Sequence, residues 1–162
     1  SVWEGHFEND ALNGKGYFRF PDGSHYEGEF LNSEPHGKGT VLWEDGTKYE
    51  GEFKYGKKEG KGTMAWLDGR KYEGQWKNDK MQGEGVFIWP EGKVYRGQYV
   101  EDKRQGYGEF LWPDGRFYKG NWLNGEKHGK GVYRSRDGVE QPGVWEHDHR
   151  VKEPGNAKAE HH

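Results

Sequence analysis

Apolar and polar positions alternate over two short stretches, and this arrangement recurs at a fixed interval along the chain. In the first stretch of one such interval, Tyr72, Gly74 and Trp76 fall on one side of an extended backbone, and two polar residues fall on the other. Positions 83–89 alternate in the same way. An alternating pattern is typical of β-strands, and no window shows a convincing helical period. The pattern therefore predicts two short strands per interval and almost no helix.

Turn-forming residues separate these predicted strands. Asn78 and Asp79 lie between the two strands of one pair. Pro-Glu-Gly at 90–92 follows the second strand, and Pro-Asp-Gly occupies the same place at 21–23 and 113–115. Such residues favour tight turns. Each interval is thus predicted to form a β-hairpin that leads into the next one.

An aromatic residue opens every repeat, with no insertion anywhere: Trp3, Tyr26, Tyr49, Tyr72, Tyr95 and Tyr118. The spacing divides the chain into repeats at 3–25, 26–48, 49–71, 72–94, 95–117 and 118–140. We predict a degenerate capping repeat at 141–152 and a flexible tail at 153–162. Self-similarity at a short fixed period is typical of stacked repeats. The predicted fold is all-β, an elongated, single-layer, solenoid-like stack of β-hairpins.

Glycine recurs four times in each repeat. Because glycine inside a strand is costly, its recurrence indicates a structural requirement. Gly74 leaves a gap between two aromatic side chains on one face. We therefore expect the rings of one hairpin to pack against the glycine gaps of the next. Gly83 and Gly85 are expected to need a positive φ or a close backbone approach.

The composition alone would favour disorder, because 30% of residues are apolar, 33% are charged and the mean hydropathy is −1.33. The aromatic content of 16%, in phase with the glycines, argues for a folded stack instead. The chain has no cysteine, which excludes disulfides and favours an intracellular protein. No apolar run is long enough to span a bilayer as a helix. The start at Ser1 indicates a piece of a longer protein, and His161-His162 indicates a purification tag.

Charge and motifs narrow the classes of function. The net charge is −3, and acidic residues are interleaved with the basic ones, so no basic stripe indicates a nucleic-acid partner. The sequence has no P-loop, no cysteine nucleophile and no G-x-S-x-G motif, so we predict neither catalysis nor a cofactor. His147 and His149 flank Asp148 and are suitable zinc ligands. An exposed polar tail explains them better, and no metal site is predicted.

Three phrases resemble the MORN (membrane occupation and recognition nexus) repeat: Tyr49-Glu50-Gly51-Glu52-Phe53, Tyr72-Glu73-Gly74-Gln75-Trp76 and His128-Gly129-Lys130-Gly131. The resemblance covers residues 3–140, with Phe or Tyr replacing Trp in four repeats and the His kept at 36 and 128. It implies a stack of hairpins with a groove lined by aromatic side chains. Arrays of this family act as interaction and scaffold modules, also beside lipid-kinase domains, and phospholipid binding is often proposed for them.

Ten aromatic residues of the first strands are candidates for a partner-binding groove. In that hypothesis a partner's peptide or helix contacts their amphipathic rings, and some tyrosine hydroxyls face the groove. The alternative is that the rings pack one repeat against the next. The ten residues are Tyr26, Phe30, Tyr49, Phe53, Tyr72, Trp76, Tyr95, Tyr99, Tyr118 and Trp122. Four tryptophans that end the second strands are expected to cap the edge of the stack: Trp43, Trp66, Trp89 and Trp112.

Charged residues provide a second set of candidates. Glu27, Glu50 and Glu73 point away from the tyrosines, either as a solvated face or as an acidic strip that selects a basic partner. Six basic residues are candidates for contacting anionic lipid, because each cation near a bilayer contributes about 1 kcal/mol. They are Lys57, Lys58, Lys61, Lys103, Arg104 and Lys127.

The sequence thus predicts a non-catalytic protein-interaction and scaffold module within a larger cytoplasmic protein at a membrane or cytoskeletal site. The alternative is a regulatory module that binds phosphoinositides or other anionic phospholipids, for example beside a phosphatidylinositol-phosphate kinase. A homodimer through a terminal repeat is also expected, since an uncapped edge strand invites association.

Overall fold

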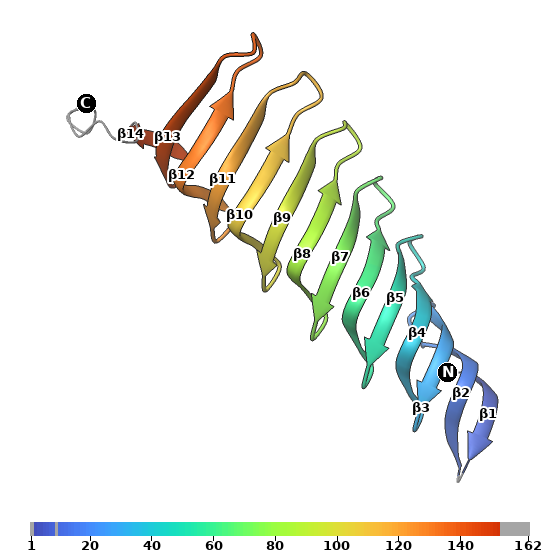
Figure 1. Ribbon diagram of the computed structural model, residues 1–162. Coiled ribbons are helices and arrows are strands. Elements are labelled where there is room, and N and C mark those ends of the chain that lie inside the picture. Colours follow the sequence, from blue (N-terminus) through green and yellow to red (C-terminus); the bar gives the residue numbers. More distant parts are fainter. Residues whose placement is uncertain (1, 9, 153–162) are drawn as a thin grey trace. The chain divides into compact units, whose positions relative to one another are not determined.

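The computed structural model describes residues 2–8 and 10–152, which form β-strands and turns (Figure 1). The tail predicted at 153–162 lies outside the described residues. Two compact parts make up the chain, an N-terminal half (1–80) and a C-terminal half (81–162). In the described residues no helix is long and apolar enough to cross a membrane. The all-β prediction is confirmed.

Each half is an antiparallel sheet in which strands that are neighbours in sequence pair with each other. The strands of the N-terminal half are β1 (Val2–Glu8), β2 (Ala11–Arg19), β3 (His25–Leu31), β4 (Glu34–Leu42), β5 (Lys48–Lys54), β6 (Lys57–Ala65) and β7 (Lys71–Lys77). Those of the C-terminal half are β8 (Lys80–Ile88), β9 (Val94–Val100), β10 (Lys103–Leu111), β11 (Phe117–Leu123), β12 (Glu126–Arg134), β13 (Glu140–Glu146) and β14 (His149–Lys152).

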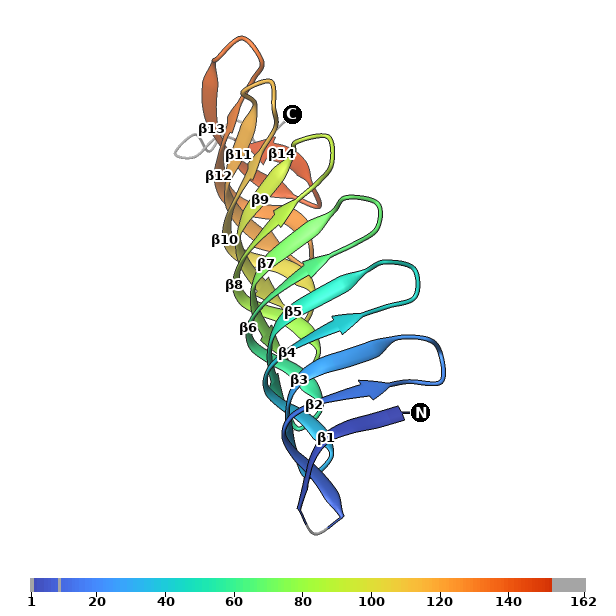
Figure 2. The ribbon, with the colours of Figure 1, turned by 90° about the vertical axis from the view of Figure 1, so that its right-hand side faces the viewer.

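A seam of paired glycines runs across each sheet. In the N-terminal half Gly28 pairs with Gly39, and Gly39 pairs with Gly51. In the C-terminal half Gly97 pairs with Gly108 in the same way. In the hairpins β3–β4, β5–β6 and β11–β12 the register of strand pairing shifts just after the seam, which indicates a β-bulge. Figure 2 shows the strands curving along their length.

The opening tyrosines form the centre of both halves and are fully buried. The Tyr26 hydroxyl donates a hydrogen bond of 2.7 Å to the carbonyl of Glu29, three residues later in the same strand. A straight strand would carry that carbonyl out of reach, so the backbone bends around the ring. We call the side of the sheet that carries these tyrosines the inner face, and the side that carries Glu27, Glu50 and Glu73 the outer face.

The glycine gaps hold the rings of their own hairpin, and the expectation that they hold rings of the next hairpin is wrong. A methyl group on Gly39 would overlap the Tyr26 ring, which belongs to the same repeat. The next repeat contributes a different contact to the Tyr26 ring: the rings of Tyr26 and Phe53 meet edge to face, with their centres 5.1 Å apart. Gly83 has a φ of 92°, which confirms the expectation for that residue.

Two-residue turns connect the two strands of each hairpin and form hydrogen bonds with the preceding repeat. Asn78 and Asp79 both have positive φ, as in a type I′ turn. The Asp79 N–H donates to the Lys58 carbonyl at 3.1 Å, and the Asp79 carboxylate accepts from the Lys58 N–H at 2.9 Å. Where glycine replaces this aspartate, at Gly56 and Gly125, the first bond persists, to Pro35 and Arg104 respectively.

This turn contact provides a matched pair of substitutions. We expect Gly125→Asp to have a free energy of unfolding at least about 1 kcal/mol higher than Gly56→Asp, because it gains one hydrogen bond, whereas an aspartate at position 56 also lies beside the Glu34 carboxylate. Both glycines have similar positive φ, 85° and 81°, so the conformational cost is shared. Only Arg104 offers an N–H, because Pro35 has none. Urea unfolding followed by tryptophan fluorescence measures the difference, and equal stabilities would refute the proposed role of the turn carboxylate.

Candidate functional site on the inner face

The ten aromatic residues predicted to line a groove are all buried, at most 7% exposed. They are the packing rings of the stack and lie on the inner face, as the edge-to-face contacts of Tyr49 with Phe53 and with Trp76 show. Whether a partner also contacts them stays a prediction. Their burial leaves little surface for such a contact.

The five opening tyrosines do not present free hydroxyls, which corrects that part of the groove hypothesis. Each hydroxyl donates to a backbone carbonyl three residues later, at 2.7 to 3.0 Å. Burial raises the pKa of Tyr95 and Tyr118 to about 12, and it also raises the pKa of Tyr26 and Tyr49. These groups therefore stabilise the bend of the strand and are closed to a ligand.

Accessible aromatic surface is found on the four tryptophans after the second strands, which are half-buried. Basic side chains stack on them. The Arg70 guanidinium lies 5.0 Å from the Trp66 ring centre, and Arg116 lies 5.0 Å from that of Trp112. Stacking of a cation on an indole face is favourable and keeps both groups in place.

One position decides how much of each repeat's aromatic surface is covered. It is the second residue of the second strand, which we call the cover position: Leu12, Pro35, Lys58, Met81, Arg104 and Lys127. The ammonium of Lys58 lies over the rings of Trp43, Tyr49 and Trp76, at 5.4 to 5.9 Å from their centres. In repeats with a long basic residue at the cover position, that side chain shields the rings from solvent.

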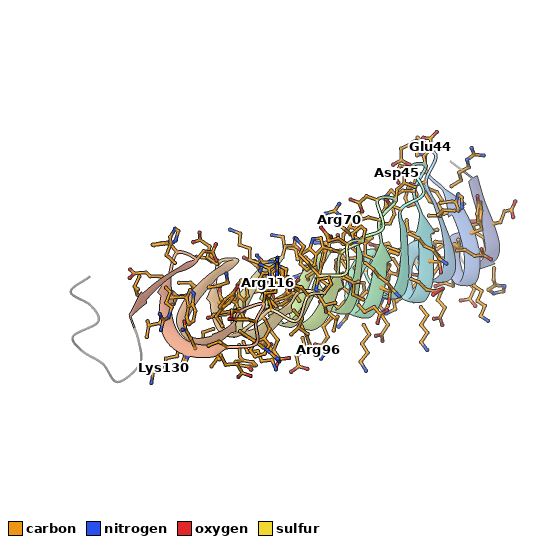
Figure 3. The ribbon with its side chains drawn as sticks, turned by 90° about the horizontal axis from the view of Figure 1, so that it is seen from above. Glu44, Asp45, Arg70, Arg96, Arg116 and Lys130 are labelled. Carbon is orange, nitrogen blue, oxygen red and sulfur yellow. The ribbon has the colours of Figure 1, made fainter. Side chains whose placement is uncertain are left out.

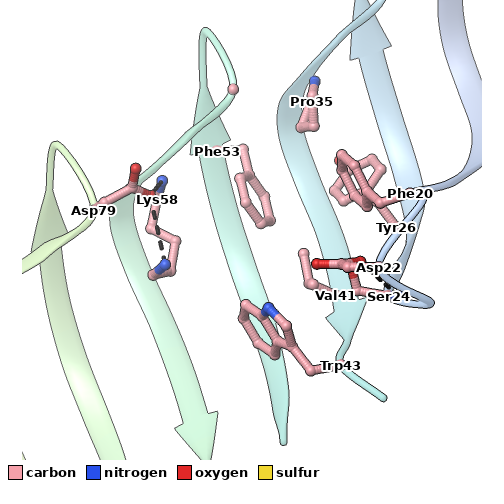
Figure 4. A pocket seen from close by; sticks show the side chains of 11 residues that line it. Phe20, Asp22, Ser24, Tyr26, Pro35, Val41, Trp43, Phe53, Lys58 and Asp79 are labelled. Carbon is pink, nitrogen blue, oxygen red and sulfur yellow. Dashed lines mark hydrogen bonds and ion pairs between the residues drawn. The ribbon is translucent and has the colours of Figure 1, made fainter.

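Proline at the cover position leaves a hollow of about 280 Å³ on the inner face of the N-terminal half (Figure 4). Its floor and walls include Phe20, Tyr26 and Phe53, one repeat before the rings that Lys58 covers. Val41 and Trp43 also line it, while Lys58 and Asp79 provide a polar border, 3.4 Å apart. The hollow therefore exists because Pro35 is short and the neighbouring turn carries Gly56.

The sequence did not indicate this hollow, although a signal is present. Residue size at the cover position varies from proline to arginine, whereas the ring positions around it stay aromatic in these repeats. A comparison of the cover position across the repeats would have marked Pro35. The consequence of a proline at this position follows only from the structure, in which the cover residue lies over the rings of two repeats.

The six basic residues predicted to contact lipid are divided between the two faces. Lys57, Lys61 and Lys103 are exposed, on the outer face. Lys58, Arg104 and Lys127 alternate with them along the strands and lie half-buried over rings on the inner face. They do not share one surface. Contact with lipid stays a prediction.

The outer face carries further exposed charge. Glu27, Glu50 and Glu73 are exposed there, and Lys71 pairs with Glu73 at 2.7 Å. In the C-terminal half Arg96 and Lys130 project from the sheet on the side away from Arg116 (Figure 3). Among the described residues no group of three or more His, Asp or Glu side chains is arranged to hold a metal ion.

Two solved structures resemble the chain at low sequence identity. The TCP domain of SAS-4 from Drosophila melanogaster, in complex with a proline-rich motif of Ana2, is 13% identical, with a TM-score of 0.48 over 81% of this chain and 79% of that one. A catalytically inactive virginiamycin B lyase from Staphylococcus aureus, with quinupristin, is 11% identical, with a TM-score of 0.20 over 89% of this chain and 45% of the other.

The sequence comparisons are decisive about the family. No curated protein matches the chain significantly. The MORN repeat family matches at residues 3–25, 26–48, 49–69, 72–94, 95–115 and 118–140, which is most of the chain. With the hairpin fold and the paired glycines described above, these six matches show that the chain belongs to the MORN repeat family.

Proposed function

We propose that this array is a protein-interaction module, and that the hollow beside Pro35 receives an apolar side chain from an extended segment of its partner. The observation that carries the proposal is the open hollow that Phe20, Trp43 and Phe53 help to line. Aromatic side chains in a concave, half-open site are typical anchors of protein interfaces.

The size of the hollow favours a peptide side chain over a cofactor. At about 280 Å³ it lies just below the usual range of sites for small molecules, roughly 300–1,000 Å³. One prolyl, leucyl or aromatic side chain with its adjoining backbone suits this space. The paired charges of Lys58 and Asp79 at the border offer a donor and an acceptor to the partner's backbone.

The charge distribution favours a protein segment over a bilayer as the ligand of the array. A flat anionic membrane requires basic side chains on one accessible surface. The candidate cations divide between the inner and outer faces, and three of them are half-buried over aromatic rings.

The substitution Pro35→Arg tests the proposal because it copies the arrangement of Arg104. Both Arg104 and Pro35 face a glycine in the next turn, and Arg104 lies over the corresponding rings Tyr95 and Trp122. We expect Pro35→Arg to fold, to fill the hollow and to weaken peptide binding at least tenfold. Dodecapeptides selected on the wild-type chain from a random phage library provide the ligands, and fluorescence anisotropy measures their affinity.

The control is Thr40→Arg, which adds the same charge to the same strand β4 but on the outer face. Its affinity for the selected peptides is expected to stay within twofold of the wild type. Thermal unfolding verifies that both variants are folded. If the library yields no peptide, or if Pro35→Arg binds the selected peptides as well as Thr40→Arg does, the hollow is not the site.

A further inference from the structure

Two basic side chains on the inner face of the C-terminal half have no acidic partner within ion-pair distance. Arg104 and Lys127 occupy the cover position in consecutive repeats. Neither forms an ion pair with any carboxylate of residues 2–8 and 10–152, whereas Arg116 on the same face pairs with Asp114 at 2.8 Å. The Nε atom of Arg104 is also enclosed without a hydrogen-bond partner.

The turn of the following repeat explains this difference between the halves. In the N-terminal half Lys58 is neutralised, because Asp79 lies 3.4 Å from its ammonium. The equivalent residue facing Arg104 is Gly125, which offers only its carbonyl oxygen, 2.8 Å from Nη2 of Arg104. Asp148 faces Lys127, but its carboxylate accepts from the Lys127 backbone N–H at 2.8 Å and lies beyond ion-pair distance of the ammonium.

Aromatic rings hold both cations in place and remove part of their hydration. The Arg104 guanidinium lies 4.8 Å from the Trp122 ring centre, and the Lys127 ammonium lies 5.7 Å from that of Tyr118. Burial lowers the pKa of Lys127; the negative charge of Asp148 opposes that effect, and the positive charge of Arg104 adds to it. An anion bound between these side chains would relieve both the lost hydration and the repulsion.

We propose that Arg104 and Lys127 bind two carboxylates of an acidic segment in a partner protein. The inference rests on the proposed function of the array as a protein-interaction module and assigns a chemical class to one partner segment. It concerns different residues from the hollow beside Pro35 and is tested separately.

The spacing of the two cations favours an acidic peptide over a phosphate group. Consecutive repeats are two strands apart, which is roughly 10 Å at the usual strand spacing. One phosphate is too small to contact both cations. Two glutamates that are two or three residues apart on an extended chain span about 7 to 10 Å and can reach both. A bilayer is disfavoured because both side chains are half-buried on the inner face.

Fluorescence anisotropy of a labelled dodecapeptide with glutamate at every second position tests the site. The chain itself carries a net charge of −3, so an acidic peptide is not attracted by overall charge. We expect saturable binding by the wild-type chain. The same peptide with glutamines in place of glutamates, inorganic phosphate and phosphatidylserine vesicles are the comparison ligands, and each is expected to bind at least tenfold more weakly.

Two kinds of variant assign the binding to these residues. Arg104→Gln combined with Lys127→Met should weaken binding at least tenfold, whereas Lys103→Gln with Lys130→Gln removes the same charge from exposed positions and should stay within twofold. Gly125→Asp supplies the missing carboxylate without removing a side chain, and it should also weaken binding at least fivefold.

Equal binding by all of these variants would overturn the proposal, as would a preference for phosphate or vesicles. Binding of the acidic peptide should be indifferent to Pro35→Arg. If the acidic peptide binds while Pro35→Arg leaves the binding of the selected peptides unchanged, the proposed peptide site in the hollow is refuted and the acidic site is not. If Pro35→Arg weakens binding of the selected peptides but the acidic peptide does not bind, only the acidic site is refuted.

Discussion

Replacing Tyr49 by alanine should lower the free energy of unfolding by about 3–5 kcal/mol, the usual cost of removing a buried aromatic side chain. Tyr49 is fully buried, and its ring contacts Phe53 in its own repeat and Trp76 in the next. Its hydroxyl donates to the Glu52 carbonyl at 3.0 Å. The substitution therefore removes the contact within a hairpin and the contact between two hairpins together.

Two milder substitutions provide the comparison in urea unfolding experiments. Tyr49→Phe keeps the ring and loses only the hydrogen bond, so about 1 kcal/mol should be lost. Tyr55→Ala removes a side chain that is 61% exposed in a turn and should cost less than that. If Tyr49→Ala is no more destabilising than Tyr55→Ala, the opening tyrosines do not form the core of the stack.

Replacing Gly108 by alanine should destabilise the C-terminal half by about 3 kcal/mol, at the upper end of the usual cost of overpacking. The added methyl group would lie 2.6 Å from two carbons of the Tyr95 ring and closer still to its hydroxyl. Tyr95 cannot move away, because it is fully buried, donates to the Gln98 carbonyl at 2.9 Å and meets Trp122 edge to face.

Two comparisons identify the clash as the cause. Gly115→Ala adds a methyl group in open space at a φ of 96°. It should therefore lower the free energy of unfolding by only about 1 kcal/mol, through backbone strain alone. In a chain that already carries Tyr95→Ala, the further change Gly108→Ala should cost less than about 1 kcal/mol, since the ring is gone. Additive effects of the two substitutions would mean that the seam glycine is needed for another reason.

Much of the fold follows from local sequence pattern. The alternation from Tyr72 to Trp76 predicts β7, and the turn residues Asn78 and Asp79 lie where the chain reverses. The order of the strands in each sheet is also predictable, because each strand pairs with its neighbours in sequence. The partner of each glycine was harder to predict. Gly39 accommodates Tyr26 of its own repeat because of a bulge in the pairing, and single-residue bulges leave no clear trace in an alternating pattern.

The candidate site was less predictable because it depends on which side chains meet across repeats. Lys57 and Lys58 were both candidates for contacting lipid because they are adjacent in sequence, although strand alternation places them on opposite faces. The hollow depends on Pro35 in one repeat and Gly56 in the next, and the unpaired charge of Arg104 depends on Gly125. In both cases the two residues belong to consecutive repeats, and neither residue is unusual alone.

The most direct test of the central claim, that the inner face binds a partner segment, is an experimental structure of the chain with the tightest peptide selected on it. The account predicts an apolar side chain of the peptide in the hollow, between Trp43 and Phe53, with the peptide backbone near Lys58 and Asp79. A peptide bound on the outer face over Glu27 and Glu50, or added as a strand to the free edge of β1 with the hollow unfilled, would contradict it.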